Sequence, residues 1–308
     1  MSETNRVMSI QEIMEKLRAA NYIPTTDIAF AVSGAMDGTP VILEGAPGVG
    51  KTFLAKAVSE MLGLPLVRVQ FYEGISYDKI LYDYDYQRQL LTIETIKSVI
   101  EKEMSGKSVS EALDAAKKIE FYGKDFLIER PVLRALNGKE RCVLLLDELD
   151  KANEEVEYTL LETLDEFSIS IPQYGTVTCP EEMRPIVFIT SNNYRQLSDA
   201  LRRRCNYLYI EQKTKEELLE ILKLRAGQDI RIAEGVAECI SKIQELPLKQ
   251  VPSIAEAAAW ANYLAGHKES LREKGAVAHT ISMVAKDRGD VDMILRSGYL
   301  KEVEKSWM

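Results

Sequence analysis

Hydrophobic residues recur at helical spacing near the start of the chain, after a polar tail at residues 1–8. Glu12 stands three positions after Ser9, which is the pattern of a capped helix start. The hydrophobic positions that follow this cap are Ile10, Ile13, Met14 and Leu17. Pro24 interrupts the pattern. A second helix is predicted over about residues 27–36, and the turn signal Asp37-Gly38 ends it.

After these two helices, five segments are predicted to be β-strands, and helical patterns separate them. The segments are residues 41–43, 65–72, 141–147, 185–190 and 206–210. The first, third and fourth are continuous apolar runs, which are typical of strands buried on both faces of a parallel sheet. The second alternates apolar and polar positions. Helices are predicted over residues 53–62, with Gly63 as a C-terminal cap, and over residues 151–167. Strands that alternate with helices predict an α/β fold.

Two segments differ from this alternation. Residues 169–178 carry Pro172 and Gly175 between alternating positions and are predicted to form a hairpin. In residues 82–86 tyrosine and aspartate alternate. This segment is either a short strand with one aromatic face packed on the protein or a partner-contacting insert, and the sequence favours neither. Residues 92–122 are predicted to be a charged, exposed helical excursion with a break at Ser105-Gly106.

From Thr214 onward the hydrophobic pattern is helical only. We therefore expect two domains, an α/β core at residues 1–212 and a helical domain at residues 213–308. Within the core, inserts are expected at about residues 73–91 and 168–178. The sequence contains neither an internal repeat nor a low-complexity tract.

Composition excludes several kinds of protein. Lys and Arg number 39 and Asp and Glu 48, so the net charge of −9 weighs against non-specific DNA binding. The four cysteines show no C-x-x-C spacing and only two histidines are present, so we expect no zinc site. Residues 1–6 are polar and no apolar run approaches about 20 residues, so we expect no signal peptide, no membrane span and a cytoplasmic protein.

A glycine-rich motif directly follows the first predicted strand. Residues 45–52 match the phosphate-binding pattern G-x-x-x-x-G-K-[ST], with the members Gly45, Ala46, Pro47, Gly48, Val49, Gly50, Lys51 and Thr52. The glycines let backbone N–H groups approach phosphate oxygens. Lys51 would reach the β- and γ-phosphates, and Thr52 would offer its hydroxyl to Mg²⁺. The helix that starts here adds the positive end of its dipole.

Polar residues follow two of the buried strands. Asp147 and Glu148 end the third strand, at the sheet edge where ligands of parallel sheets bind. Asp147 is placed to hold Mg²⁺ and Glu148 to polarise an attacking water. Asn192 follows the fourth strand and could bond a γ-phosphate or orient that water; the alternative is a turn formed by Asn192-Asn193. Three arginines, Arg202, Arg203 and Arg204, stand before the last strand and suit an arginine finger for a neighbouring subunit.

Together with the helical C-terminal part, these motifs resemble the AAA+ ATPases. More narrowly, the chain resembles the MoxR branch over about residues 20–265. The segments that carry this narrower resemblance are residues 70–74, 82–90, 130–133, 171–176 and 197–205. The resemblance implies a five-stranded parallel sheet between helices, a C-terminal helical lid, and a ring, usually hexameric, with ATP and Mg²⁺ at each subunit interface.

The resemblance also implies roles for single residues. Lys51 and Thr52 would bind phosphate and Mg²⁺, Asp147 and Glu148 would be the Walker B pair, and Asn192 would be sensor 1. Arg204 is the first candidate for the finger. One departure concerns sensor 2, an arginine in related lids, because residues 251–254 hold none. Either a lysine such as Lys249 replaces it, or lid closure is coupled to ATP differently.

Members of this branch act as chaperone-like motors on protein clients. They often work with a partner that carries a von Willebrand factor A domain, and they often mature metal-cofactor enzymes. The two inserts would face the pore or the client. One alternative is a nucleic-acid motor of the restriction or helicase type, against which the acidic charge and the lack of an evident DNA-binding module weigh. A non-hydrolysing scaffold is another, and the intact pair Asp147-Glu148 argues against it.

Overall fold

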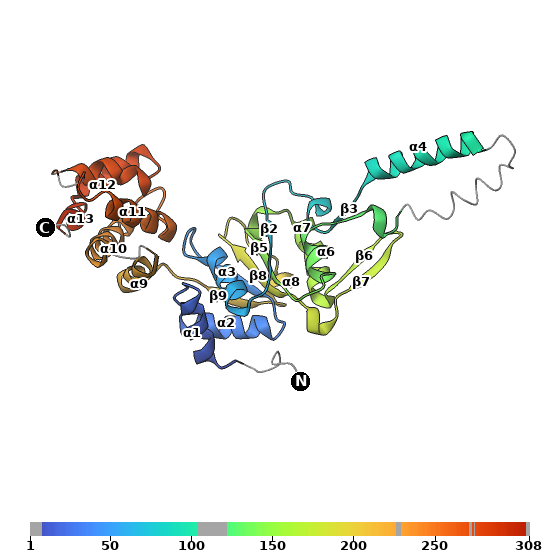
Figure 1. Ribbon diagram of the computed structural model, residues 1–308. Helices are drawn as coiled ribbons and strands as arrows, with labels where there is room; N and C mark the ends of the chain where they lie inside the picture. The colour runs from blue at the N-terminus through green and yellow to red at the C-terminus, as the bar shows by residue number, and fades with distance from the viewer. Residues whose placement is uncertain (1–7, 104–121, 226–228, 271–272, 274, 306–308) are drawn as a thin grey trace.

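The structure, a computed structural model, describes residues 8–103, 122–225, 229–270, 273 and 275–305. Its centre is a parallel sheet in the order β2-β5-β8-β1-β9, with helices on both faces (Figure 1). The strands are β1 (Val41–Glu44), β2 (Leu66–Gln70), β5 (Val143–Asp147), β8 (Ile186–Ser191) and β9 (Asn206–Tyr209). The predicted five-stranded parallel sheet between helices is thereby confirmed.

Burial explains why the strand patterns differ. Every residue of β1, β5 and β8 is buried, because these central strands are covered on both faces. Edge strand β2 instead alternates, with Val67 and Val69 buried and Arg68 and Gln70 exposed. The exposed pair therefore lies along an open edge of the sheet, next to the carboxyl end of β5.

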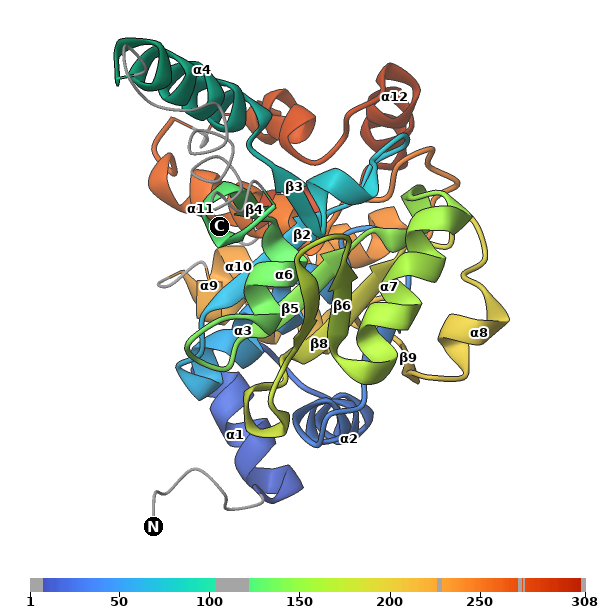
Figure 2. The same cartoon turned by 90° about the vertical axis from the view of Figure 1, so that its right-hand side faces the viewer.

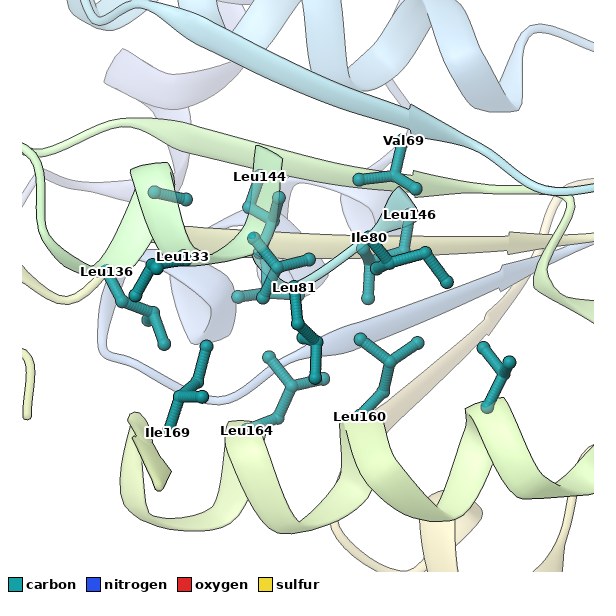
Figure 3. Packing of buried hydrophobic residues seen from close by; sticks show 14 of the residues in the cluster. Val69, Ile80, Leu81, Leu133, Leu136, Leu144, Leu146, Leu160, Leu164 and Ile169 are labelled. Carbon is teal, nitrogen blue, oxygen red and sulfur yellow. The ribbon is translucent and has the colours of Figure 1, made fainter. Parts of the chain in front are cut away.

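Two hydrophobic layers sandwich the sheet. One face packs against α1 (Ile10–Ala19), α2 (Thr26–Met36) and α3 (Lys51–Leu62). The other packs against α6 (Pro131–Leu136) and α7 (Glu154–Glu166). Figure 3 shows this second layer, where Leu144 and Leu146 of β5 meet leucines of both helices. Ser9 caps α1 with the predicted capping box. The start of α7 differs from the prediction, since Asn153 caps it and residues 149–151 form a separate 3₁₀ turn.

The predicted hairpin is confirmed as β6 (Ser168–Ile171) and β7 (Gly175–Thr178), which pair antiparallel. A 3₁₀ turn (Glu181–Met183) leads from β7 towards β8, and the four-residue α8 (Asp199–Arg202) precedes β9. Gln173 in the connecting turn and Gly175 at the start of β7 both have positive φ. The hairpin lies beside α7 on the face of the sheet shown in Figure 2.

The tyrosine-rich segment contains a short strand, which was one of its two alternatives. After a 3₁₀ turn (Tyr77–Lys79), strand β3 (Tyr82–Tyr84) pairs antiparallel with β4 (Leu127–Glu129), which a second 3₁₀ turn (Lys124–Phe126) precedes. The Tyr84 hydroxyl donates to the Pro172 carbonyl oxygen at 3.1 Å, so this ring packs on the protein. Helix α4 (Tyr86–Glu103) then begins at residue 86, and the predicted start at residue 92 was wrong. The expected break at Ser105-Gly106 lies outside the described residues.

Asp85 explains the early start of α4, because its carboxylate accepts the N–H of Arg88 at 2.9 Å, as a helix cap does. The helix projects from the body of the molecule (Figure 1). Its described side chains include exposed Tyr86, Leu90 and Leu91.

The described residues after β9 form helices and turns, as predicted. They are α9 (Lys215–Arg225), α10 (Ile230–Gln244), α11 (Ile254–Gly266), a 3₁₀ segment (Ala276–Met283), α12 (Arg288–Ser297) and α13 (Lys301–Lys305). These helices enclose a hydrophobic core of their own around Trp260, whose indole N–H donates to the Thr280 hydroxyl at 2.7 Å. Among the described residues, no helix is both long and apolar enough to cross a bilayer.

Candidate functional site

The loop between β1 and α3 needs its glycines for two reasons. Gly45 and Gly48 have φ of 153° and 81°, and the second value is one that residues with a Cβ rarely adopt. A Cβ on Gly45 would also lie 2.3 Å from the Ile210 carbonyl oxygen, and one on Gly48 would lie 2.4 Å from the Cβ of Ser253. The loop therefore keeps its backbone N–H groups bare while other segments press against it.

Lys51 is the first residue of α3 and is 6% exposed. Its ammonium donates to the carbonyl oxygens of Gly45 at 2.6 Å and Ala46 at 2.9 Å. Burial lowers the pKa of Lys51, and nearby carboxylates, Asp150 first among them, oppose that shift. A buried amine at the N-terminus of a helix suits an anion, since the helix dipole and the amine act on the same charge.

Asp147 ends β5 and is 1% exposed. Its Oδ1 accepts two hydroxyl hydrogen bonds, from Thr52 at 2.9 Å and from Thr190 at 2.6 Å. Its Oδ2 accepts two hydrogen bonds from the Arg68 guanidinium, at 2.9 Å from Nε and 2.6 Å from Nη2. The structure thus brings together Thr52 and Asp147, the two residues expected to hold Mg²⁺. Hydroxyl and carboxylate oxygens are ligands that Mg²⁺ prefers, so the residues present fit that ion.

Glu148 follows Asp147 in the left-handed region, with φ of 60°. Asn192 donates its side-chain N–H to Oε1 of Glu148 at 3.0 Å, so these two predicted residues are in contact. Gln70 and Lys151 donate to Oε2 at 2.9 Å and 2.7 Å. The backbone N–H of Glu148 donates to the Thr190 hydroxyl at 2.8 Å. Three side chains and one backbone bond therefore fix the direction of this carboxylate.

Asp150 was not singled out from the sequence, yet it builds the same site. It is buried, and its Oδ2 accepts the backbone N–H groups of Asn192 at 2.9 Å and Tyr194 at 2.8 Å. These bonds hold the loop after β8 against the end of β5. The sequence did carry a signal, because a third acid follows Asp147 and Glu148 within three positions.

The glycine-rich loop opens on a pocket of about 270 Å³. Besides the loop and the residues above, its lining includes Tyr22, Ile23, Lys213, Ile221 and Ile254. The first two lie between α1 and α2, and the last two lie on helices of the C-terminal part. These distant segments form an apolar wall beside the polar loop, and sequence patterns could not predict their convergence.

The stretch at residues 251–254 does reach the loop. The N–H of Ile254 donates to the Gly48 carbonyl oxygen at 3.4 Å, where Ser253 caps α11. Lys249 is not placed at the pocket, because its ammonium pairs with Asp287 at 2.9 Å. Lys213 is the lysine beyond β9 that lines the pocket, and it pairs with Glu217 at 3.1 Å.

The three arginines differ in their contacts, and Arg202 lies beside Glu44, the residue directly before the glycine-rich loop. Arg204 precedes β9, whose first residue pairs with the first residue of β1, so it lies at the opposite edge of the sheet. It pairs with Asp165 at 3.1 Å. Arg202 approaches Glu44 at 3.7 Å and stacks on Tyr207. Arg203 is exposed, without an ion pair to any described residue.

A loop of this kind between a buried parallel strand and a helix is the phosphate-binding arrangement of P-loop NTPases. Residues 40–205 match the family described as AAA domain (dynein-related subfamily), which takes in more than half of the chain. The chain therefore belongs to this family, and the prediction of an AAA+ ATPase is confirmed at that level.

Other similar proteins are distant. A Lon protease of Fusobacterium nucleatum subsp. nucleatum is 23% identical over 257 residues, which are 79% of this chain and 29% of that protein. Two mutant forms of RuvB from Thermotoga maritima have TM-scores of 0.43 and 0.45 at 16% and 15% identity. The matches cover 96% of this chain and 73% and 72% of those chains.

Proposed function

We propose that this protein binds ATP with Mg²⁺ and hydrolyses it. The observation that carries the proposal is the hydrogen bond between the side chains of Asn192 and Glu148. Glu148 directly follows Asp147, which is bonded to Thr52. It puts a fixed carboxylate beside an amide donor at the mouth of a phosphate-binding loop. That combination serves a reaction in which a base must face a water and a donor must face a phosphate.

Each part of the site has one task in this proposal. The N–H groups of the loop and Lys51 bind the phosphates, and the apolar wall around Ile23 and Ile254 takes the base. Thr52 and Asp147 hold Mg²⁺, which neutralises phosphate charge when it is bound. Glu148 accepts a proton from the attacking water, and Asn192 orients that water or the terminal phosphate.

Replacing Glu148 by Gln tests the proposal. The variant keeps the shape and the amide contact but removes the base, so we expect hydrolysis to fall by about 10² or more while ATP affinity is kept. Glu154→Gln, at the exposed start of α7, is the control with an equal charge change. Phosphate release and equilibrium ATP binding are the measurements. Undiminished hydrolysis would remove Glu148 from its role, and the absence of ATP binding by the wild type would end the proposal.

We further propose a MoxR-like remodelling motor, with residues 213–308 as a lid and the inserts at 73–91 and 168–178 facing a client. In this proposal the ring is homo-oligomeric, usually hexameric, and a von Willebrand factor A-domain protein is its partner, with metal-enzyme maturation as the task. The position of Arg204 supports an assembly of this kind, since the arginine lies at the sheet edge opposite its own loop. Capture of a client by the Glu148→Gln variant in ATP is the direct test.

A further inference from the structure

Arg68 reaches from edge strand β2 to the carboxylate of Asp147 on the neighbouring strand. Both of its hydrogen bonds, at 2.9 Å and 2.6 Å, end on the same oxygen, Oδ2. The other oxygen, Oδ1, is taken by the hydroxyls of Thr52 and Thr190. A carboxylate has about four acceptor positions, so Asp147 is fully engaged in this structure.

This arrangement conflicts with the role proposed for Asp147. To hold Mg²⁺ or one of its waters, Asp147 must offer an oxygen, and Oδ1 already serves two hydroxyls. Oδ2 is the oxygen that remains, and the Arg68 guanidinium holds it. A guanidinium stays protonated at every ordinary pH, so a proton cannot remove this competitor. The divalent cation and Arg68 must therefore exclude each other at Oδ2.

The surroundings of Arg68 allow it to leave. Its side chain is 44% exposed, whereas that of Asp147 is 2% exposed, and β2 is one of the two edge strands of the described sheet. Departure would also disturb Glu148, because Arg68 donates to the Gln70 side-chain oxygen and the Gln70 amide donates to Glu148. The two residues of β2 thus connect both acids of the site.

We propose that Arg68 is a positioning residue that neutralises Asp147 in the nucleotide-free protein and gives way to the divalent cation. Arg68 thereby sets the Mg²⁺ concentration at which nucleotide binds tightly. The inference rests on the proposed function, since it assumes that nucleotide and Mg²⁺ bind here.

Arg68→Met keeps the length of the side chain and removes the competitor. A Mg²⁺ titration of binding by a fluorescent, non-hydrolysable ATP analogue should show its midpoint at a Mg²⁺ concentration roughly three- to tenfold lower than in the wild type, the size expected for a half-exposed charged pair. Arg130→Met is the matched control, because Arg130 forms a similar pair with Asp83 at 2.9 Å that does not line the pocket. Its midpoint should stay where the wild type has it.

Mn²⁺ binding without nucleotide, followed by electron paramagnetic resonance, gives a second readout. We expect tighter Mn²⁺ binding in Arg68→Met than in the wild type. If Arg68→Met does not fold, Arg68→Lys replaces it, since an ammonium is a point charge that lacks the guanidinium fork, and its midpoint should shift the same way.

The outcomes separate this inference from the proposed function. If the wild type binds no analogue at any Mg²⁺ concentration, the proposed function fails. If it binds but the variant's midpoint is unchanged, only the inference fails. Weaker binding of the metal-free analogue with an unchanged midpoint would assign Arg68 to a phosphate and would likewise overturn the competition.

Discussion

The Thr190 hydroxyl donates to the Asp147 carboxylate at 2.6 Å, and the oxygen of that hydroxyl accepts the backbone N–H of Glu148 at 2.8 Å. One side chain of β8 thereby fixes both acids at the end of β5, the first through its carboxylate and the second through its backbone. Thr190 is 1% exposed, so water does not compete for these bonds.

We expect Thr190→Val, which keeps the shape and removes the hydroxyl, to lower the free energy of unfolding by about 1–3 kcal/mol. ATP hydrolysis should fall further than stability explains, because Glu148 loses a fixed direction. Urea denaturation and phosphate release measure the two effects. Thr163→Val is the control, since this threonine is also buried and its hydroxyl donates to the Thr159 carbonyl oxygen at 2.9 Å within α7. An equal loss of hydrolysis in both variants would contradict the role of Thr190.

Asn192→Ala should slow hydrolysis by about 10² while the affinity for ATP changes little, the effect of losing one oriented donor. The backbone of residue 192 stays bonded to Asp150, so the loop should keep its shape. Single-turnover hydrolysis and ATP titration separate the two quantities. Asn137→Ala removes another amide–carboxylate contact, with Glu129 at 2.6 Å, and should leave hydrolysis unchanged. A loss of affinity as large as the loss of rate would make Asn192 a binding residue.

Gly48→Ala and Gly74→Ala form a pair that separates strain from contact. The two glycines have similar φ, 81° and 83°, but only a Cβ on Gly48 would meet another atom, in Ser253. Both variants should therefore lose about 1–2 kcal/mol to the left-handed backbone. Gly48→Ala should in addition weaken ATP binding, because it pushes α11 off the loop. Calorimetry and ATP titration would show this difference, and equal effects of the two variants would exclude it.

The lowered pKa of Lys51 has a consequence for stability at alkaline pH. The unfolded chain holds the Lys51 proton more tightly than the folded protein does. The contribution of Lys51 to the free energy of unfolding therefore increases as the pH rises towards the ordinary lysine pKa of 10.5. The stability of the wild type relative to Lys51→Met should therefore increase as the pH rises from neutral towards 10.5. Urea titrations of both proteins across this range measure it, and a difference that falls would contradict the burial of the charged amine.

If Arg204 acts on the nucleotide of a neighbouring subunit, Arg204→Ala should lower the rate of ATP hydrolysis by about 10³. The affinity of the variant subunit for ATP should not change. The pair of Arg204 with Asp165 is half exposed on both sides, so that bond is weak enough to exchange. Mixing Arg204→Ala with Lys51→Ala subunits should restore part of the hydrolysis. Arg203→Ala is the control with the same change at the adjacent position. Without restoration at any ratio, the arginine would not act between subunits.

The strands of the sheet could be predicted because burial leaves a direct record in the sequence. Covered strands such as β5 and β8 are buried at every position, and they are apolar up to the polar residues at their carboxyl ends. The glycine-rich loop was predictable for a related reason, since its backbone tolerates few residues. The start of α4 at Tyr86 was not predicted, because Tyr86 ends an alternation of tyrosine and aspartate that is typical of a strand. The strand ends at Tyr84, and the cap at Asp85 starts the helix directly after it.

The contacts that complete the site could not be predicted. Arg68 meets Asp147 only because β2 and β5 pair in one particular register, with Gln70 opposite Asp147. The apolar wall likewise depends on how α11 approaches the loop. Register and approach are set by packing across the whole sheet, and a single sequence does not record them locally.

The bond from the Ile254 N–H to the Gly48 carbonyl joins two backbone groups. Ordinary side-chain replacement cannot delete it, so a scan with alanine would pass over the connection between the loop and the C-terminal helices. Proline is the exception. Ile254 is the first residue of α11, where a proline fits without breaking the helix, and Ser253 already has the extended backbone that precedes one. The single substitution Ile254→Pro can therefore remove the backbone hydrogen bond between α11 and the glycine-rich loop while α11 stays intact.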